Sequence, residues 1–379
     1  MNKKIKYTAL SLALTLPSIA SAERLNYAIG FTTGSFVDAG KVFAEEVKKY
    51  SEGDLDIRVF PLSLLNFAEM SDGVGQGMAD FGTVLTPYFP ESYPNTNMVA
   101  DLSMTLMLKE GVSHEQSTVA YAGAMAEYVM LNCDDCQVEY KNENQVFTSS
   151  IMTTPYTLLC REKVASLDDI SGKKVRVAAA PWARWVESLG GSPIVMSANE
   201  SYEALSQGVV DCDIQAAAQL SSLKLSDIVT DVTVNIPGGL FSGGGSANMN
   251  LSKWNKQSSA NKKAIMTASA GLVASQAFEG IEYAKKALDS AKNNGIALHE
   301  ADPDLTNRTQ VFVRKDLEGI VNEYAQKYSV QDAQKKAAAF IEILNEWEIL
   351  APDLDSRESF KDALLDRVYS KVNVNTYGS

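Results

Sequence analysis

In the first part of the chain, segments with the hydrophobic pattern of a strand alternate with segments that have the pattern of a helix. Residues 24–31 and 53–61 alternate between apolar and polar positions and are rich in strand formers. Residues 35–51 instead place apolar side chains at helical spacing, and residues 66–85 read as a helix followed by a short strand. This order of strand, helix, strand, helix and strand predicts an α/β domain with a mainly parallel sheet.

A second region repeats this order. Residues 145–161 contain two runs rich in strand formers, and short helical and strand-like segments alternate over residues 166–215. We therefore expect a second α/β domain at residues 151–245, and a first at residues 23–150 completed by part of residues 246–379. Residues 258–294 are rich in alanine and poor in helix breakers, which predicts a helix long enough to brace both domains.

A glycine-rich stretch, residues 236–254, follows the second unit. It lacks the Gly-Lys-Ser/Thr ending of a phosphate-binding loop and the placement of a dinucleotide-binding GxGxxG motif between a strand and a helix. We interpret it as a crossover between domains, where the backbone must bend or approach a neighbour closely.

The first 22 residues have the features of a cleavable secretory signal peptide. Lysines at positions 3, 4 and 6 precede a short apolar run, and Ala20-Ser21-Ala22 forms a small-residue cleavage site. We expect cleavage after Ala22 and export, to the periplasm if the source is a Gram-negative bacterium. Cleavage would remove the three lysines and change the net charge from −13 to −16. Such an acidic chain is a poor candidate for nucleic-acid binding.

Four cysteines in an exported chain suggest two disulfides. Pairing each cysteine with its neighbour in the sequence gives Cys133–Cys136 and Cys160–Cys212, although four cysteines allow three sets of pairs. Cys133-Asp-Asp-Cys136 could instead be a redox centre. The two aspartates between the cysteines would raise thiol pKa values, so a structural disulfide is the favoured interpretation and an exported thiol-disulfide oxidoreductase is the alternative.

Other catalytic signals are weak. The two histidines, His114 and His299, have no companion at metal-ligand spacing, and no G-x-S-x-G motif occurs. We predict neither a cofactor nor a metal, and no enzymatic activity.

Arg176 is the most informative single residue. It lies in the apolar, strand-like run 173–180, and no acidic residue occurs within five positions on either side. Burial of an unpaired cation is costly, so its partner is either a distant carboxylate of the chain or a ligand. A guanidinium binds a carboxylate through two parallel hydrogen bonds, and two-domain α/β proteins place their cleft at the carboxyl ends of the strands.

These motifs resemble one family closely. The stretches SLDDISGKKVRV (166–177) and LGGSPIVMSANESYEALSQGVVDCDI (189–214) are similar to the signature region of the dicarboxylate-binding (DctP-type) substrate-binding proteins of TRAP transporters. The resemblance extends over nearly the whole mature chain. It implies a two-domain periplasmic binding protein fold, with a central cleft and a long helix spanning both domains. It also implies capture of a small organic carboxylate, such as a dicarboxylate, a hydroxy or keto acid or an aromatic acid, for membrane subunits driven by an ion gradient. A role with a sensor instead of a transporter is a further alternative.

The resemblance also implies the site. Arg176 inherits the role of the arginine that pairs with the ligand carboxylate. Tyr156 stands where many members carry a second arginine, which favours a less charged or an aromatic acid. Gln215 falls near a position where many members place a polar amide. Together with these residues we expect the following near the ligand: Phe36, Tyr88, Trp182 and Phe241.

Overall fold

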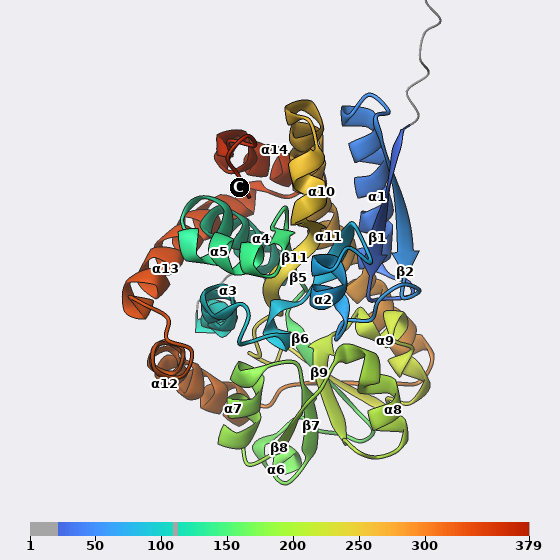
Figure 1. Ribbon diagram of the computed structural model, residues 1–379. Helices are drawn as coiled ribbons and strands as arrows, with labels where there is room; N and C mark the ends of the chain where they lie inside the picture. Colours follow the sequence, from blue (N-terminus) through green and yellow to red (C-terminus); the bar gives the residue numbers. More distant parts are fainter. Residues whose placement is uncertain (1–21, 109–112, 379) are drawn as a thin grey trace, which may run out of the picture.

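The computed structural model describes residues 22–108 and 113–378, so the expected signal peptide lies, apart from Ala22, outside the described residues. Two six-stranded sheets form the framework of the molecule. The first sheet lies in the upper part of Figure 1 and the second in the lower part. In the first sheet the order is β2-β1-β3-β11-β4, with β5 also paired to β11. Its strands are β1 (Glu23–Ile29), β2 (Leu55–Pro61), β3 (Phe81–Val84), β4 (Gln145–Val146), β5 (Ser150–Met152) and β11 (Ser242–Asn250).

The second sheet has the order β12-β10-β6-β9-β7-β8. Its strands are β6 (Tyr156–Cys160), β7 (Lys174–Val177), β8 (Ser192–Val195), β9 (Cys212–Ala216), β10 (Asp231–Val234) and β12 (Ala297–Glu300). Most of this sheet falls within residues 151–245, the expected second domain, but β12 joins it from much later in the chain. Conversely, part of β5 and the first residues of β11 fall within that range and pair in the first sheet.

Five of the six strands in each sheet run in the same direction, as predicted for mainly parallel sheets, and one strand in each sheet runs against them. β6 runs antiparallel to both neighbours in the second sheet, and β11 runs antiparallel to β3, β4 and β5 in the first. Each of these two strands enters its sheet directly from the other one. A strand that arrives by such a crossover has no helix to return it to the starting edge, and therefore runs against its neighbours.

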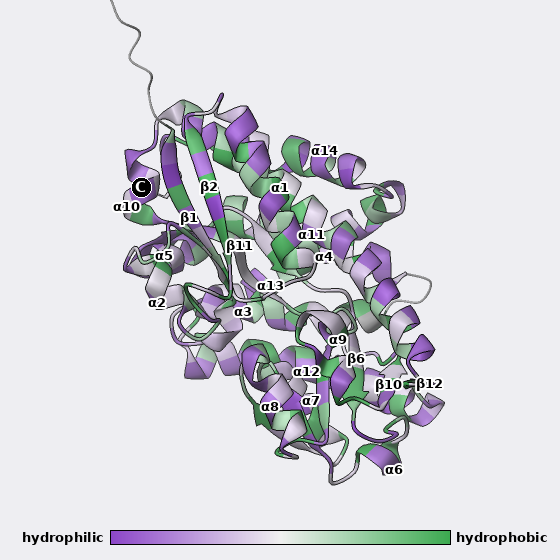
Figure 2. Cartoon of the chain, turned by 90° about the vertical axis from the view of Figure 1, so that its right-hand side faces the viewer, coloured by the Kyte–Doolittle hydropathy of each residue, from purple (hydrophilic) through white to green (hydrophobic). Residues whose placement is uncertain are grey.

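Helices cover the faces of both sheets. Around the first sheet lie α1 (Ser35–Tyr50), α2 (Met70–Gly75), α3 (Pro94–Ala100), α4 (His114–Leu131), α5 (Asp134–Asn142), α10 (Leu251–Lys256), α13 (Ala333–Leu350) and α14 (Arg357–Arg367). Around the second lie α6 (Leu167–Ile170), α7 (Ala180–Ser188), α8 (Ser201–Ser206) and α9 (Gln219–Ser222). Figure 2 shows that many of these helices carry hydrophilic and hydrophobic residues side by side, as expected for helices with one face on a core.

Two long helices connect the units. α11 (Ser259–Asn293) packs against α1 and α14 beside the first sheet and against α9 and β12 beside the second, which confirms the predicted bracing helix. α12 (Pro303–Lys327) likewise contacts both the 3-10 segment Asp101–Leu108 of the first unit and α7 of the second. Among residues 22–108 and 113–378, none of the helices combines the length and the apolar character that a membrane-spanning segment needs.

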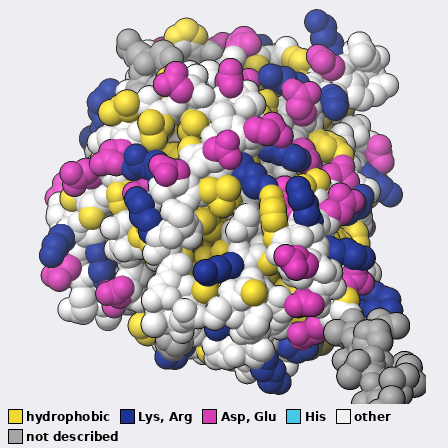
Figure 3. Space-filling view, turned by 90° about the horizontal axis from the view of Figure 1, so that it is seen from above, with side chains coloured by type: hydrophobic (Ala, Val, Ile, Leu, Met, Phe, Trp, Pro, Cys, Tyr) yellow, Lys and Arg dark blue, Asp and Glu magenta, His cyan; other side chains and the backbone are white. Residues whose placement is uncertain are grey.

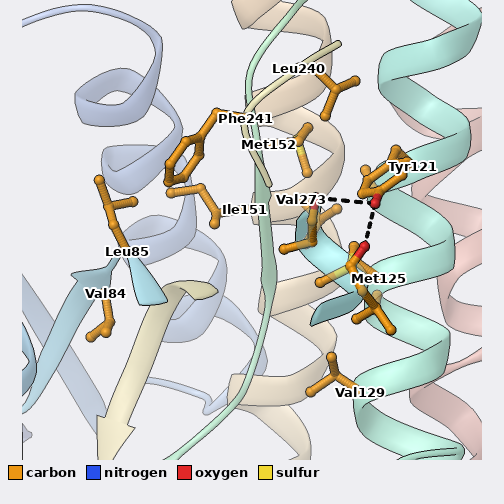
Figure 4. Close-up of a cluster of buried hydrophobic side chains, with 14 of the residues drawn as sticks. Val84, Leu85, Tyr121, Met125, Val129, Ile151, Met152, Leu240, Phe241 and Val273 are labelled. Atoms are coloured by element: carbon orange, nitrogen blue, oxygen red, sulfur yellow. Dashed lines mark hydrogen bonds between the residues drawn. The ribbon is translucent and has the colours of Figure 1, made fainter. Parts of the chain in front are cut away.

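A continuous hydrophobic core extends from the first sheet to the crossing strands. Figure 4 shows Leu85, Ile151 and Phe241 at one edge of this cluster and Tyr121 of α4 at the opposite edge. The Tyr121 hydroxyl donates to the backbone carbonyl oxygen of Val99 at 2.5 Å. This edge of the core, where β3, β5 and the start of β11 meet, also borders the site described next.

Candidate ligand-binding site

Arg176 has an acidic partner that the local sequence does not reveal. Its strand β7 pairs in parallel with β9, and this pairing sets Arg176 opposite Asp213. The two side chains are 1% and 0% exposed, and Nη1 lies 3.4 Å from Oδ1 of Asp213. The partner stands 37 residues further along the chain, so only the sheet register brings it into contact.

The rest of the guanidinium is held by polar groups of the second unit and by one residue of the first. Nε and Nη2 donate to the carbonyl oxygen of Met196 at 3.1 and 2.7 Å, and Nη2 also donates to the hydroxyl of Tyr88 at 3.1 Å. Burial lowers the pKa of Arg176, but Asp213 and the two neighbouring phenols outweigh it, so the pKa lies above its ordinary value. A guanidinium has five N–H groups. These contacts and the one to Asp213 use four of them, which leaves one N–H of Nη1 for another acceptor.

Arg176 lies in the wall of a small cavity between the two units, termed here the inner cavity. Its volume is about 30 Å³, room for roughly two water molecules. Six of the seven residues expected near the ligand line it: Phe36, Tyr88, Tyr156, Arg176, Gln215 and Phe241. The other wall residues are Phe31, Leu85, Ile151, Thr153, Ala178, Ala198 and Gln219.

Trp182, the seventh expected residue, does not line the inner cavity. Its ring stacks on Phe241 at a centroid distance of 6.2 Å and tilts against Tyr156 at 5.0 Å. Its indole N–H donates to the carbonyl oxygen of Gly238 at 2.8 Å. Trp182 therefore stands behind two wall residues and fixes the positions of their rings.

Tyr156 presents an uncharged phenol to the inner cavity. Burial raises its pKa well above the ordinary value, although the charge of Arg176 acts in the opposite direction. The hydroxyl thus keeps its proton at neutral pH. No hydrogen bond to a described residue contributes to the pKa of this hydroxyl, which can donate to a ligand.

A second hollow, termed here the outer cavity, adjoins the first. Its volume is about 180 Å³, and it shares Phe31 and Ala198 with the inner cavity. Asn199, beside Ala198, closes this side of the cleft. Its side chain donates to the carbonyl oxygen of Gly30 at 2.9 Å and accepts from the N–H of Phe67 at 3.1 Å. The second unit is thereby tied to two loops of the first.

Some wall residues were missed by the sequence analysis. Phe31 follows β1, Ala178 follows β7 and Gln219 follows β9, so the rule that clefts lie at the carboxyl ends of strands could have found them. The same rule applies to Leu85, which follows β3, whereas Ile151 lies inside β5 and carries no such signal.

A larger hollow of about 330 Å³ lies elsewhere, between α11 and the second unit, and is lined in part by His114, Glu115 and Lys285. The last two pair with each other at 3.3 Å. The other histidine, His299, contacts Asp231 at 2.7 Å. The described residues contain no cluster of three or more side chains suited to a metal ion.

The cysteines form the two predicted disulfides, Cys133–Cys136 and Cys160–Cys212. Cys133 is the N-cap of α5, a position that favours a thiolate. However, both sulfur-bearing side chains of this pair are buried and the adjacent charged residues, Asp134 and Asp135, are acidic. The surroundings therefore favour a structural bond over a redox centre.

Comparisons with known proteins establish the family. The model of the bacterial extracellular solute-binding proteins, family 7, matches residues 147–364, more than half of the chain. The chain belongs to this family, whose members are solute-binding proteins, as the sequence analysis predicted. The C4-dicarboxylate-binding periplasmic protein DctP of Rhodobacter capsulatus is 24% identical over 249 residues, which cover 60% of this chain and 66% of that protein.

Solved structures confirm the predicted fold class. A TRAP periplasmic solute-binding protein from Bordetella bronchiseptica, with bound (R)- and (S)-mandelate, has a TM-score of 0.70 and 23% identity, and the match covers 88% of this chain and all of that one. A TRAP solute-binding protein from Rhodoferax ferrireducens, in complex with benzoate, has a TM-score of 0.72 and 17% identity over 87% of this chain and 100% of that one. The fold is thus the two-domain fold of TRAP solute-binding proteins.

Proposed function

We propose that the protein is the periplasmic receptor of a TRAP transporter and that it captures a small organic carboxylate between its two sheets. The observation that carries the proposal is the place of Arg176, a buried cation in the wall of a cavity between the units. Its remaining N–H and the Tyr156 hydroxyl supply donors for carboxylate oxygens. The structurally similar proteins bind mandelate and benzoate, both of which are organic carboxylates.

Capture requires the two units to move apart. A cavity of about 30 Å³ is too small for an organic acid, so the ligand enters an opened cleft and the units close around it. We propose that residues 151–245 move largely as one body. The other body comprises residues 23–150 and much of residues 246–379. Closure shifts the population toward the form that the membrane subunits recognise.

The proposal includes export and partners. Cleavage after Ala22 would release the mature chain into the periplasm, and the membrane subunits would take the ligand from it in uptake driven by an ion gradient. Figure 3 shows acidic and basic side chains interspersed on the face seen from above, so that face offers no continuous basic surface to a nucleic acid.

Ligand screening followed by substitution of Arg176 tests the proposal. The mature protein is screened by thermal shift against C4-dicarboxylates, hydroxy and keto acids, sugar acids and aromatic acids, and affinities of the hits are measured by calorimetry. Arg176→Met should weaken binding at least 100-fold, because a buried charge-assisted pair is lost. Since this change leaves Asp213 without its cation, the double variant R176M/D213N removes both charges and protects the fold.

Arg161→Met is the matched control, because Arg161 is exposed and lies outside the inner cavity. Its affinity should equal that of the unmodified protein. A folded R176M/D213N variant that binds the same acid within threefold of the unmodified protein would show that Arg176 does not hold the ligand.

A further inference from the structure

Hydrogen-bond donors gather around Arg176 in the inner cavity. The Tyr88 hydroxyl accepts from Nη2 of Arg176 at 3.1 Å and from the N–H of Ala198 at 3.0 Å. Because these bonds occupy its lone pairs, its own hydrogen is left to donate. With the Tyr156 hydroxyl and the remaining N–H of Arg176, three donors face a ligand, and a carboxylate group can accept from all of them.

Gln215 contributes an acceptor. Its amide nitrogen lies 2.7 Å from Oδ2 of Asp213 and 2.9 Å from Oγ of Ser201. A carboxylate can only accept, so this contact fixes the orientation of the amide, and the two bonds use both of its hydrogens. The group that Gln215 can offer to the cavity is therefore its carbonyl oxygen Oε1.

Gln219 contributes a second acceptor. It follows β9 as the first residue of α9, lines the inner cavity and is 4% exposed. Its oxygen Oε1 is buried and has no hydrogen-bond partner among the described residues. Buried carbonyl groups without a partner are rare because they destabilise the fold, so this one requires a donor from outside the chain, either a bound water molecule or a ligand.

The net charge of the site also favours a ligand with a single carboxylate. Arg176 and Asp213 cancel each other before any ligand binds. One ligand carboxylate then gives the buried site a single negative charge. A second carboxylate would add another negative charge in a position where it meets carbonyl oxygens instead of donors.

We infer that the ligand is a monocarboxylate that also carries a hydroxyl or amide N–H group, and that Gln219 accepts a hydrogen bond from this group. The inference rests on the proposed function and goes beyond it, because it names the second functional group, the residue that recognises it and the exclusion of dicarboxylates. The Thr153 hydroxyl, which accepts from the N–H of Phe241 at 3.1 Å, can pair with either kind of group.

Matched pairs of acids test the inference by calorimetry. The pairs are benzoate with 3-hydroxybenzoate, phenylacetate with mandelate, and succinate with succinamate, which replaces one carboxylate by an amide. In at least one pair the donor-bearing acid should bind at least tenfold more tightly, and succinate should bind more weakly than succinamate. In Gln219→Met this preference should fall below threefold.

Two controls separate the possible results. Gln207→Met makes the same chemical change at an exposed position outside the cavity and should keep the full preference. The melting temperature of ligand-free Gln219→Met should not fall, since the lost oxygen has no partner. The inference is overturned if no pair shows a preference, if succinate binds as tightly as succinamate, or if Gln219→Met keeps the preference, as it would if Gln219 bound only water. If no acid of any kind binds, the proposed function itself fails.

Discussion

At the scale of single residues, Asp101 links pH to stability. It is buried beside α12, where the Tyr324 hydroxyl donates to Oδ2 at 2.8 Å. Burial raises its pKa to about 7, and the nearby charge of Arg184 offsets only part of this effect. Between its unfolded pKa near 4 and pH 7, the folded protein holds a proton that the unfolded chain releases. The free energy of unfolding should therefore fall as pH rises through this range.

The variant Asp101→Asn should not show this loss. Relative to the unmodified protein, its free energy of unfolding should rise from pH 5 to pH 8 by up to about 3 kcal/mol, an upper bound from the shift in pKa. Urea unfolding at several pH values measures the difference. Asp54→Asn, at an exposed position, provides the baseline. A difference between D101N and the unmodified protein that stays constant from pH 5 to pH 8 would contradict this account.

Part of the site was readable from single residues, and part was not. Arg176, Tyr156 and Gln215 were predictable because a family motif and the strand-end rule mark their positions. The pairing of Arg176 with Asp213 was not, because it depends on which strands become neighbours in the second sheet. Trp182 was expected near the ligand because it is an aromatic residue close to the motif, but it packs behind Tyr156 and does not line the inner cavity.

At the scale of elements, β11 shows where sequence patterns fail. Its stretch of glycine, serine and asparagine predicts a crossover, and residues 235–241 do cross between the sheets, but the following residues form a strand in the interior of the first sheet. A methyl group on Gly244 would lie 2.0 Å from the carbonyl oxygen of Val84. Close backbone approach thus requires glycine, although glycine lowers the strand propensity from which the prediction is made.

The two disulfides should differ in their effect on stability. Cys160–Cys212 joins neighbouring strands β6 and β9 across 52 residues, whereas Cys133–Cys136 spans three. From the entropy of the closed loop, removal of the first should cost about 4 kcal/mol and removal of the second about 2 kcal/mol. Urea unfolding of C160A/C212A and C133A/C136A compares them, each serving as the control for the other. A larger loss for C133A/C136A would mean that loop closure does not set their contributions.

At the scale of the whole molecule, the two α/β units and the bracing helix α11 were predictable, because helix and strand periodicity extend over long segments, whereas the second connecting helix, α12, was not predicted. The closed arrangement was not, because it depends on contacts between distant loops. Asn199 makes the clearest of these contacts, because the nitrogen of its side-chain amide donates to Gly30 and the oxygen accepts from Phe67. Tyr88 makes another, since it belongs to the first unit and bonds to Arg176 and Ala198 of the second.

Asn199 should therefore set the balance between open and closed forms. Asn199→Ala removes two hydrogen bonds that exist only when the cleft is closed, each worth about 1 kcal/mol. The affinity for an organic acid should fall by up to about thirtyfold. Small-angle scattering at a subsaturating concentration of the acid should show a larger mean radius of gyration than for the unmodified protein. Asn199→Asp, which keeps the acceptor for Phe67 and loses the donor to Gly30, should weaken binding as well. Asn294→Ala is the control, because that side chain bonds only within α11 and its cap. If N199A bound as tightly as the control, closure would be governed by the ligand contacts alone and not by the rim of the cleft.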